Sequence, residues 1–174
     1  MKPYSRMNNR VVVLDCDWFT FGSKKLIKQI AFCEVESKAS RLYKLTIPRC
    51  LAFNSESFHK QAQHSHGLDW SEKGEYSCDR VSHILNDIIQ RLDSTHDIIF
   101  WAKGREKAML LSSYGFDVLN LDAKKCPRYR DLTNRRMTTR SKAETFADWM
   151  REHTEHDFLT HPQLLTKMQY KTTC

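Results

Sequence analysis

The stretch VVVLDCDWFTF, residues 11–21, starts as an apolar run typical of a buried β-strand and then contains two aspartates, Asp15 and Asp17. Because side chains alternate across a sheet, residues two apart lie on the same face, so these two carboxylates would stand side by side. Like charges repel at that separation unless a positive charge lies between them. The sequence leaves two interpretations open: the strand ends at Leu14 and both aspartates are solvated, or the pair binds a divalent metal.

Two more strands are predicted immediately after this stretch. The sequences LIKQIAFCEV (26–35) and SRLYKLTI (40–47) flank the turn-like ESKAS. Pro48 ends the third strand, because proline has no backbone N–H to donate to a neighbouring strand. We therefore expect a meander of three strands, followed by a short helix at residues 55–63.

The clearest helix in the sequence is DRVSHILNDIIQRL, residues 79–92. Its apolar residues recur at the i, i+3, i+4 spacing of a single buried face. This spacing predicts that Leu85 and Ile88 are core residues. The residues that share the face are Val81, Ile84, Leu85, Ile88, Ile89 and Leu92.

Strands and helices alternate after this helix. Apolar strands are predicted at residues 97–102 and 117–121, with a short helix at 105–114 between them and a last helix at 141–153. A helix that connects two strands implies that the strands are parallel. The predicted fold class is therefore α/β, with the meander and the helix-strand-helix-strand-helix series built around a mixed sheet.

The length of 174 residues suits one domain with a core, which we expect at residues 1–153, followed by a weakly patterned tail at 154–174. No apolar run approaches the ~20 residues of a transmembrane helix, and the first residues lack the apolar core of a signal peptide. We expect an intracellular protein of the cytoplasm or nucleus with no membrane partner. The six cysteines are scattered, which predicts free thiols.

Basic residues predominate, and the formal net charge of +7 indicates an anionic partner. The segment 124–142 contains eight basic residues and one acidic residue. Arginine guanidinium groups bind phosphates through paired hydrogen bonds, and an aromatic ring can stack on a base, so RNA or single-stranded nucleic acid is the expected partner. The candidate contact residues are Lys124, Lys125, Arg128, Tyr129, Arg130, Arg135, Arg136, Arg140 and Lys142.

The predicted order of elements resembles the ribonuclease H-like superfamily. It is most similar to the DEDD exonuclease branch, whose members hold two magnesium ions with acids from the first strand, the short central helix and the last helix. The sequence LDCD (14–17) gives Asp-x-Asp where these exonucleases usually show Asp-x-Glu. The resemblance implies a ribonuclease H-like fold over about residues 11–153.

The same resemblance implies a set of catalytic carboxylates. Asp15 would bridge two Mg²⁺ or Mn²⁺ ions, and Asp17 would bind one of them. Glu106 is the carboxylate of the central helix, and Glu144 or Asp148 would complete the site from the last helix. Such a centre would make the chain a metal-dependent hydrolase of phosphodiesters, similar to 3′-5′ exonucleases that act on RNA or single-stranded DNA. The last helix lacks the general-base His or Tyr of the family motif.

A second resemblance is to the Maelstrom domain of germline small-RNA pathways, which is itself ribonuclease H-like and usually lacks the acidic set. It rests on KQIAFCEVES, LYKLTIP and FHKQAQHSHGLDW. Maelstrom domains carry a Glu, Cys, His, Cys-type zinc site. The corresponding positions here are Gln29, Cys126, Tyr129 and Ser141, of which only Cys126 is a usual zinc ligand, so zinc is not expected.

Two alternatives to a working nuclease stay open. One keeps the fold without the chemistry, as a pseudonuclease that binds RNA or a protein partner. The other is a protein-interaction domain with an acidic partner. Convergence of Asp15, Asp17, Glu106 and an acid of the last helix in a structure would favour the enzyme.

Overall fold

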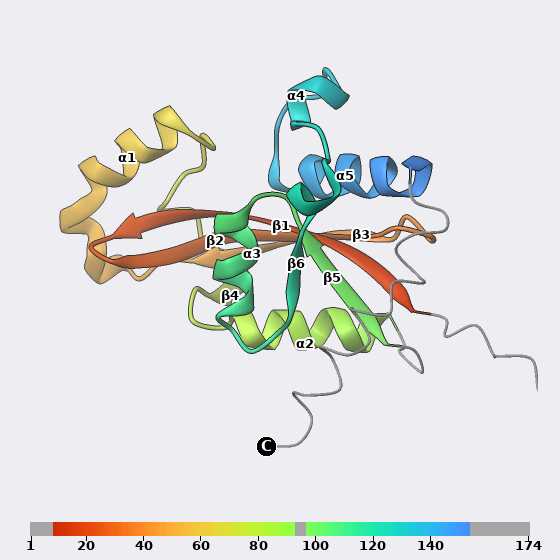
Figure 1. The fold of residues 1–174 in the computed structure, drawn as a ribbon. Helices are drawn as coiled ribbons and strands as arrows, with labels where there is room; N and C mark the ends of the chain where they lie inside the picture. Colours follow the sequence, from red (N-terminus) through yellow and green to blue (C-terminus); the bar gives the residue numbers. More distant parts are fainter. Residues whose placement is uncertain (1–8, 93–96, 154–174) are drawn as a thin grey trace, which may run out of the picture.

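The computed structural model describes residues 9–92 and 97–153, so the predicted tail at 154–174 lies outside the described residues. Six strands in these residues form one mixed sheet in the order β4-β3-β2-β1-β5-β6 (Figure 1). The strands are β1 (Arg10–Phe21), β2 (Lys24–Glu34), β3 (Ser40–Thr46), β4 (Tyr76–Ser77), β5 (Ile98–Ala102) and β6 (Val118–Asn120). The α-helices are α1 (Ser55–His64), α2 (Val81–Arg91), α3 (Arg105–Ser112), α4 (Tyr129–Leu132) and α5 (Thr139–His153), and the 3-10 helices are η1 (Arg49–Asn54) and η2 (Leu121–Lys124).

Strand β1 continues through both aspartates. Asp15 pairs with Ala31 and Asp17 with Gln29 in the antiparallel ladder between β1 and β2. The interpretation that the strand ends at Leu14 is therefore wrong. It is the parallel pairing with β5 that stops at Leu14, opposite Ala102. The two aspartates thus lie beyond the carboxyl end of β5, the kind of position where ligand sites form in α/β sheets.

The rest of the sheet follows the predicted connections. β2 and β3 are antiparallel, whereas β5 is parallel to β1 and β6 is parallel to β5. This α/β arrangement, a three-strand meander followed by helices and parallel strands, is consistent with a ribonuclease H-like fold. The sequence patterns did not predict the two-residue strand β4, the single-turn helix α4 or the 3-10 helices.

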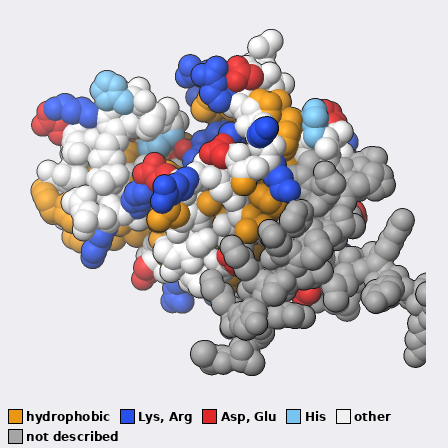
Figure 2. All heavy atoms as spheres, in the orientation of Figure 1, with side chains coloured by type: hydrophobic (Ala, Val, Ile, Leu, Met, Phe, Trp, Pro, Cys, Tyr) orange, Lys and Arg blue, Asp and Glu red, His pale blue; other side chains and the backbone are white. Residues whose placement is uncertain are grey.

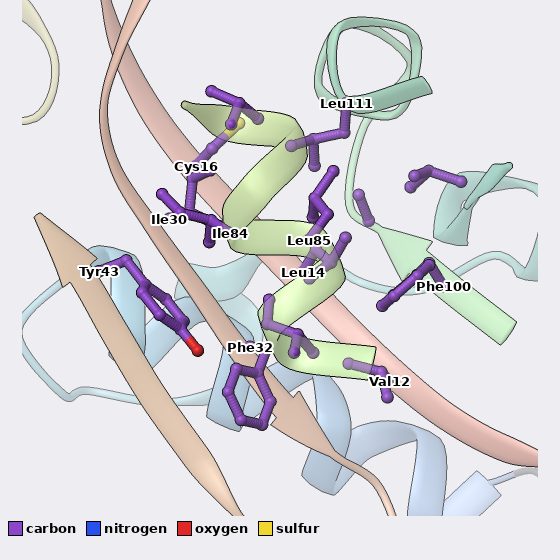
Figure 3. Close-up of a cluster of buried hydrophobic side chains, with 14 of the residues drawn as sticks. Val12, Leu14, Cys16, Ile30, Phe32, Tyr43, Ile84, Leu85, Phe100 and Leu111 are labelled. Carbon is purple, nitrogen blue, oxygen red and sulfur yellow. The ribbon is translucent and has the colours of Figure 1, made fainter. Parts of the chain in front are cut away.

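Helices cover both faces of the sheet, α2 on one side and α5 on the other (Figure 1). In Figure 3, Ile84 and Leu85 of α2 lie against side chains of the central strands, including Leu14 and Phe32, which confirms the predicted buried face. On the opposite side, α5 buries a face made of Ala143, Phe146, Ala147 and Met150.

Alternation along β1 decides which layer each side chain enters. Val12, Leu14 and Cys16 belong to the core cluster under α2, whereas Val11 and Val13 belong to the cluster under α5. Asp15 and Asp17 have the parity of Val13, so their carboxylates point toward the α5 layer. No helix within residues 9–92 and 97–153 has the length and apolar character needed to cross a membrane.

Candidate functional site

The carboxylates of Asp15 and Asp17 share one ammonium group, that of Lys142. Lys142 Nζ lies 3.1 Å from Asp15 Oδ2, and 2.9 and 3.1 Å from the two carboxylate oxygens of Asp17. Lys142 comes from the first turn of α5, directly above this part of β1. The positive charge that the strand requires between its two aspartates is therefore supplied by a side chain of the protein.

A second lysine, Lys107 of α3, completes the charge balance. Its Nζ lies 2.6 Å from Asp15 Oδ1, and the side chain of Asp15 has no exposed surface. Gly104, with a φ of 98°, turns the chain between β5 and α3, so α3 starts beside the extended part of β1. A positive φ of this kind is readily adopted only by glycine. We refer to Asp15, Asp17, Lys107 and Lys142 as the ion-pair cluster.

Polar side chains beside the ion-pair cluster add hydrogen bonds to the carboxylate of Asp17. Thr139, at the start of α5, places Oγ1 2.6 Å from Asp17 Oδ2 and 2.9 Å from Gln29 Oε1. A hydroxyl has one hydrogen, and the shorter contact assigns it to Asp17. The Thr139 hydroxyl oxygen must then accept from Gln29, which requires the side-chain NH₂ group of Gln29 to face Thr139.

Burial and charge pull the pKa values of the cluster in different directions. Burial opposes the charged form of Lys142, but Asp15 and Asp17 outweigh it and raise the pKa of that amine above its usual range. Burial likewise opposes ionisation of Asp17, yet Lys142 and Lys107 lower the pKa of that carboxyl. For Asp15 burial dominates and raises the pKa, with Lys107 and Lys142 acting against it. The two lysines therefore favour the ionised form of Asp15, against the effect of its burial.

The other predicted catalytic acids lie in separate ion pairs. Glu106 is exposed and lies 2.7 Å from Lys25, and Asp148 pairs with Arg151 at 2.8 Å. Glu144 pairs with Arg140 at 2.9 Å and with Arg135 at 3.3 Å. Each of these three acids is therefore paired with a basic residue outside the ion-pair cluster.

The residues present do not fit a two-metal centre. Within the described ranges, no group of three or more His, Cys, Asp or Glu side chains is close enough to hold a metal ion. A hard divalent cation takes oxygen ligands, and the carboxylate oxygens of Asp15 and Asp17 are already in contact with ammonium groups. The negative charges of Asp15 and Asp17 are thus compensated by lysine side chains.

The sequence analysis did not single out Lys107 or Thr139, and it predicted that Lys142 contacts nucleic acid. For Thr139 and Lys142, the sequence of the last helix did contain a signal. The buried face that contains Ala143 and Phe146, continued back by four residues, includes Thr139 and Lys142. A lysine on the apolar face of a helix indicates a buried acid or carbonyl group nearby, because a buried charge must be compensated.

The predicted basic segment divides into paired and unpaired residues. Arg128 pairs with Asp131, and Arg135 and Arg140 pair with Glu144. Lys125, Arg130 and Arg136 are exposed, and their side chains make no hydrogen bond or ion pair with other residues in the described parts of the chain.

Tyr129 is a core residue. The residue is 6% exposed, and its ring packs edge-on against Phe146. Its hydroxyl lies 3.0 Å from Ser141 Oγ, and 3.2 and 3.3 Å from the backbone oxygens of Arg135 and Arg136, to which it can donate. A ring in this position cannot stack on a base, so the expectation for Tyr129 needs correction, as does that for the buried Lys142. Tyr129 holds the basic loop in place instead.

His66 fixes the loop after α1 to strand β1. Its Nε2 lies 2.9 Å from the backbone oxygen of Trp18, and its Nδ1 accepts a hydrogen bond of 3.0 Å from the backbone N–H of Leu68. Because the Trp18 oxygen can only accept, Nε2 carries the hydrogen and Nδ1 does not. This arrangement requires a neutral imidazole, and burial lowers the pKa of His66, although the Trp18 oxygen acts in the opposite direction.

We predict that acid weakens the fold through His66. Since its pKa is lower in the folded than in the unfolded chain, the stability that it contributes is present above an unfolded pKa of about 6.5 and is lost as the pH falls. The free energy of unfolding of wild type should therefore fall more steeply from pH 7 to 5 than that of His66→Gln, by at most about 1.4 kcal/mol per pH unit. Denaturant melts of both proteins, with exposed His64→Gln as control, measure the difference. Equal pH dependence in wild type and His66→Gln would contradict this role.

No protein-family model and no curated protein matches this chain in the comparisons with known proteins.

Proposed function

We propose that the chain is a nucleic-acid-binding domain with a ribonuclease H-like fold in which an ion-pair cluster takes the place of a metal centre. The observation that carries the proposal is the position of Lys142, whose ammonium lies within 3.1 Å of both first-strand aspartates. In the nucleases that the sequence resembles, acids at this place hold two metal ions. Hydrolysis by two metals needs ions with positions open to water and phosphate, and an ammonium group offers none.

Displacing the lysines would be costly. Lys142 is 8% exposed, so its ammonium depends on Asp15 and Asp17 rather than on bulk water for its partners. Breaking a buried ion pair leaves an uncompensated charge in the interior. A divalent cation would have to offset that cost before it could bind Asp15 and Asp17. These contacts support a domain that binds nucleic acid without cleaving it.

The finer relationship that fits this site best is to Maelstrom-like domains, which usually lack the acidic set. At the zinc positions of that resemblance, Tyr129, Ser141 and Gln29 hydrogen-bond to other side chains. Tyr129 Oη lies 3.0 Å from Ser141 Oγ, and Gln29 contacts Thr139. We infer that hydrogen bonds and ion pairs have replaced metal ions at both places.

The proposal that the partner is nucleic acid rests on charge. The chain is basic, and Lys125, Arg130 and Arg136 expose basic groups that no acid of the described structure neutralises. Phosphate backbones attract such groups, because binding releases counterions from the nucleic acid. An acidic protein partner is the alternative that would be left if the wild-type protein did not bind nucleic acid.

Wild-type protein is expected to show no change in melting temperature with millimolar Mn²⁺ or Mg²⁺, because Lys107 and Lys142 already contact the carboxylates of Asp15 and Asp17. It should also leave labelled single-stranded RNA and DNA intact in the presence of either metal. A metal-dependent rise in melting temperature that is lost in Asp15→Asn, together with cleavage, would instead establish a metal-dependent nuclease. Thermal melts and a gel assay of the same preparations give both readings.

We also predict that the basic segment determines the salt dependence of binding. Changing Arg130 and Arg136 to Gln should reduce the slope of log K against log salt by about 0.7 for each arginine that contacts a phosphate of a single strand. The control changes Arg80 and Arg91 to Gln, which removes the same charge at the two ends of α2, on the opposite face of the sheet. Because Arg91 pairs with Asp87 at 2.8 Å, a thermal melt checks that this variant stays folded. Equal slopes in the two double variants would show that binding does not use this segment. Absence of binding by wild type at low salt would reject nucleic acid as the partner.

A further inference from the structure

A hollow of about 380 Å³ lies between the turn that follows α1 and the segment from α4 to the start of α5. Its volume falls in the range of roughly 300–1,000 Å³ that is typical of small-molecule sites in proteins. Figure 2 shows Lys and Arg side chains beside the recess that separates the α1 region from α4. The hollow is lined by Ser65, Tyr129, Arg130, Thr133, Asn134, Arg135 and Met137.

We propose that this hollow receives one nucleotide of a single-stranded nucleic acid, a proposal that rests on the proposed nucleic-acid-binding function. Its wall combines the three kinds of group that a nucleotide needs. Two arginines can bind phosphate, hydroxyl and amide groups can bind the sugar and the edge of the base, and an apolar side chain can cover the face of the base.

The phosphate-binding groups are Arg130 and Arg135. Arg130 is exposed, and its guanidinium has no partner in residues 9–92 and 97–153. Arg135 makes one contact with Glu144, at 3.3 Å, through Nη2, and its side chain is 52% exposed. An exposed pair of this kind is weak, so the guanidinium can turn its remaining N–H groups to a phosphate. Two guanidinium groups on one hollow fit the two phosphates that flank a nucleotide.

The base-binding groups are Asn134 and Met137. Met137 is 43% exposed, and its side chain offers a flexible apolar surface to a flat ring. The amide of Asn134 is exposed, carries both donors and an acceptor, and forms no hydrogen bond with the residues that the structure describes. In a duplex the bases are stacked and paired, so such groups can reach a base only in a single strand.

The hollow is formed before any ligand binds, because Tyr129 holds its loop. The Tyr129 hydroxyl lies 3.2 Å from the backbone oxygen of Arg135 and 3.3 Å from that of Arg136. The backbone N–H of Arg135 also donates to Thr133 Oγ1 at 3.2 Å. A loop that is fixed in this way loses little conformational entropy on binding, which favours affinity.

The experiment compares Arg130→Ala with Arg136→Ala in fluorescence titrations against single-stranded RNA, single-stranded DNA and duplex RNA of equal length. Both variants lose one exposed positive charge from the same segment, but only Arg130 lines the hollow. Arg130→Ala should weaken single-strand binding about tenfold, and Arg136→Ala by about threefold or less, the share expected from counterion release alone. The RNA and DNA arms identify which strand supplies the nucleotide.

A third variant, Asn134→Leu, leaves the charge unchanged. It should weaken binding of single strands about fivefold while leaving both the salt slope and duplex binding as in wild type. Equal effects of Arg130→Ala and Arg136→Ala, no effect of Asn134→Leu, or duplex binding as tight as single-strand binding would overturn the nucleotide site while the proposed function stands. No binding by wild type to any of the three nucleic acids would overturn both. All three side chains are exposed, so unchanged melting temperatures confirm that each variant is folded.

Discussion

Changing Lys142 to Met is expected to lower the free energy of unfolding by about 3–5 kcal/mol, the usual cost of removing one member of a buried ion pair. Methionine fills a similar volume but leaves Asp15 and Asp17 facing each other without the ammonium that lies within 3.1 Å of both. The loss should shrink as the pH approaches the ordinary carboxyl pKa of about 4, because protonation removes the repulsion. Chemical denaturation at pH 7 and at pH 4.5 measures both effects.

Two controls separate the missing charge from altered packing. The double variant Asp17→Asn/Lys142→Met should recover part of the loss, since one of the two like charges is also removed. Arg140→Met, a change in the same turn of α5 at an exposed position, should cost less than about 1 kcal/mol. A double variant no more stable than Lys142→Met would contradict the electrostatic explanation.

Metal binding gives an independent reading of the same variant. With Lys142 gone, Asp15 and Asp17 present two adjacent carboxylates, so millimolar Mn²⁺ should raise the melting temperature of Lys142→Met by binding to the folded state. The wild-type protein, whose carboxylates are occupied by ammonium groups, should not respond. A response of equal size in both proteins would show that Lys142 does not compete with metal for the aspartates.

Changing Leu85 to Ala is expected to cost about 2–5 kcal/mol, because the cavity that it leaves adds to the lost burial of the side chain. Leu85 has no exposed surface and belongs to the core cluster between α2 and the sheet (Figure 3). The same cluster contains Leu14, Phe100 and Leu111. The packed partners come from β1, β5 and α3, so the cavity cannot close by moving one element. The shift of the denaturant midpoint at constant m-value measures the loss.

The matched control is Asn86→Ala, the next residue of the same helix. Asn86 is exposed, so its replacement should change stability by no more than about 0.5 kcal/mol. If Leu85→Ala and Asn86→Ala shifted the midpoint by similar amounts, the assignment of the buried face of α2 would be wrong. Ile88→Ala, which is equally buried, should behave like Leu85→Ala.

The ion-pair cluster gives the aspartates of β1 a role that does not require catalysis. Two lysine ammonium groups and two aspartate carboxyl groups meet in the cluster, which ties α3 and α5 to the central strand. A domain held in this way can present the basic segment before α5 on a stable sheet. We regard binding without cleavage as the function that this arrangement supports.

The sequence by itself determined the order of the longer strands and helices and the buried face of the helix at residues 79–92. The 3.6-residue period of residues 79–92 placed Leu85 and Ile88 in the core, and alternating side chains put Asp15 and Asp17 on one face of β1. These patterns are local, because they follow from the geometry of a few consecutive residues. The same local geometry showed that the two aspartates would need a positive charge between them if the strand continued past Leu14, which was one of the two interpretations that the sequence left open.

Only the tertiary structure decided where that charge comes from. Lys142 is 125 residues from Asp17, and Lys107 is 92 residues from Asp15. No local pattern links residues so far apart, so a metal ion and a lysine are equivalent answers until the helices are packed on the sheet. The basic segment shows the same limit: its net charge was evident, but the unpaired state of Arg130 depends on which acids the fold places nearby. Charge pairing is a property of neighbours in space, and packing alone determines those neighbours.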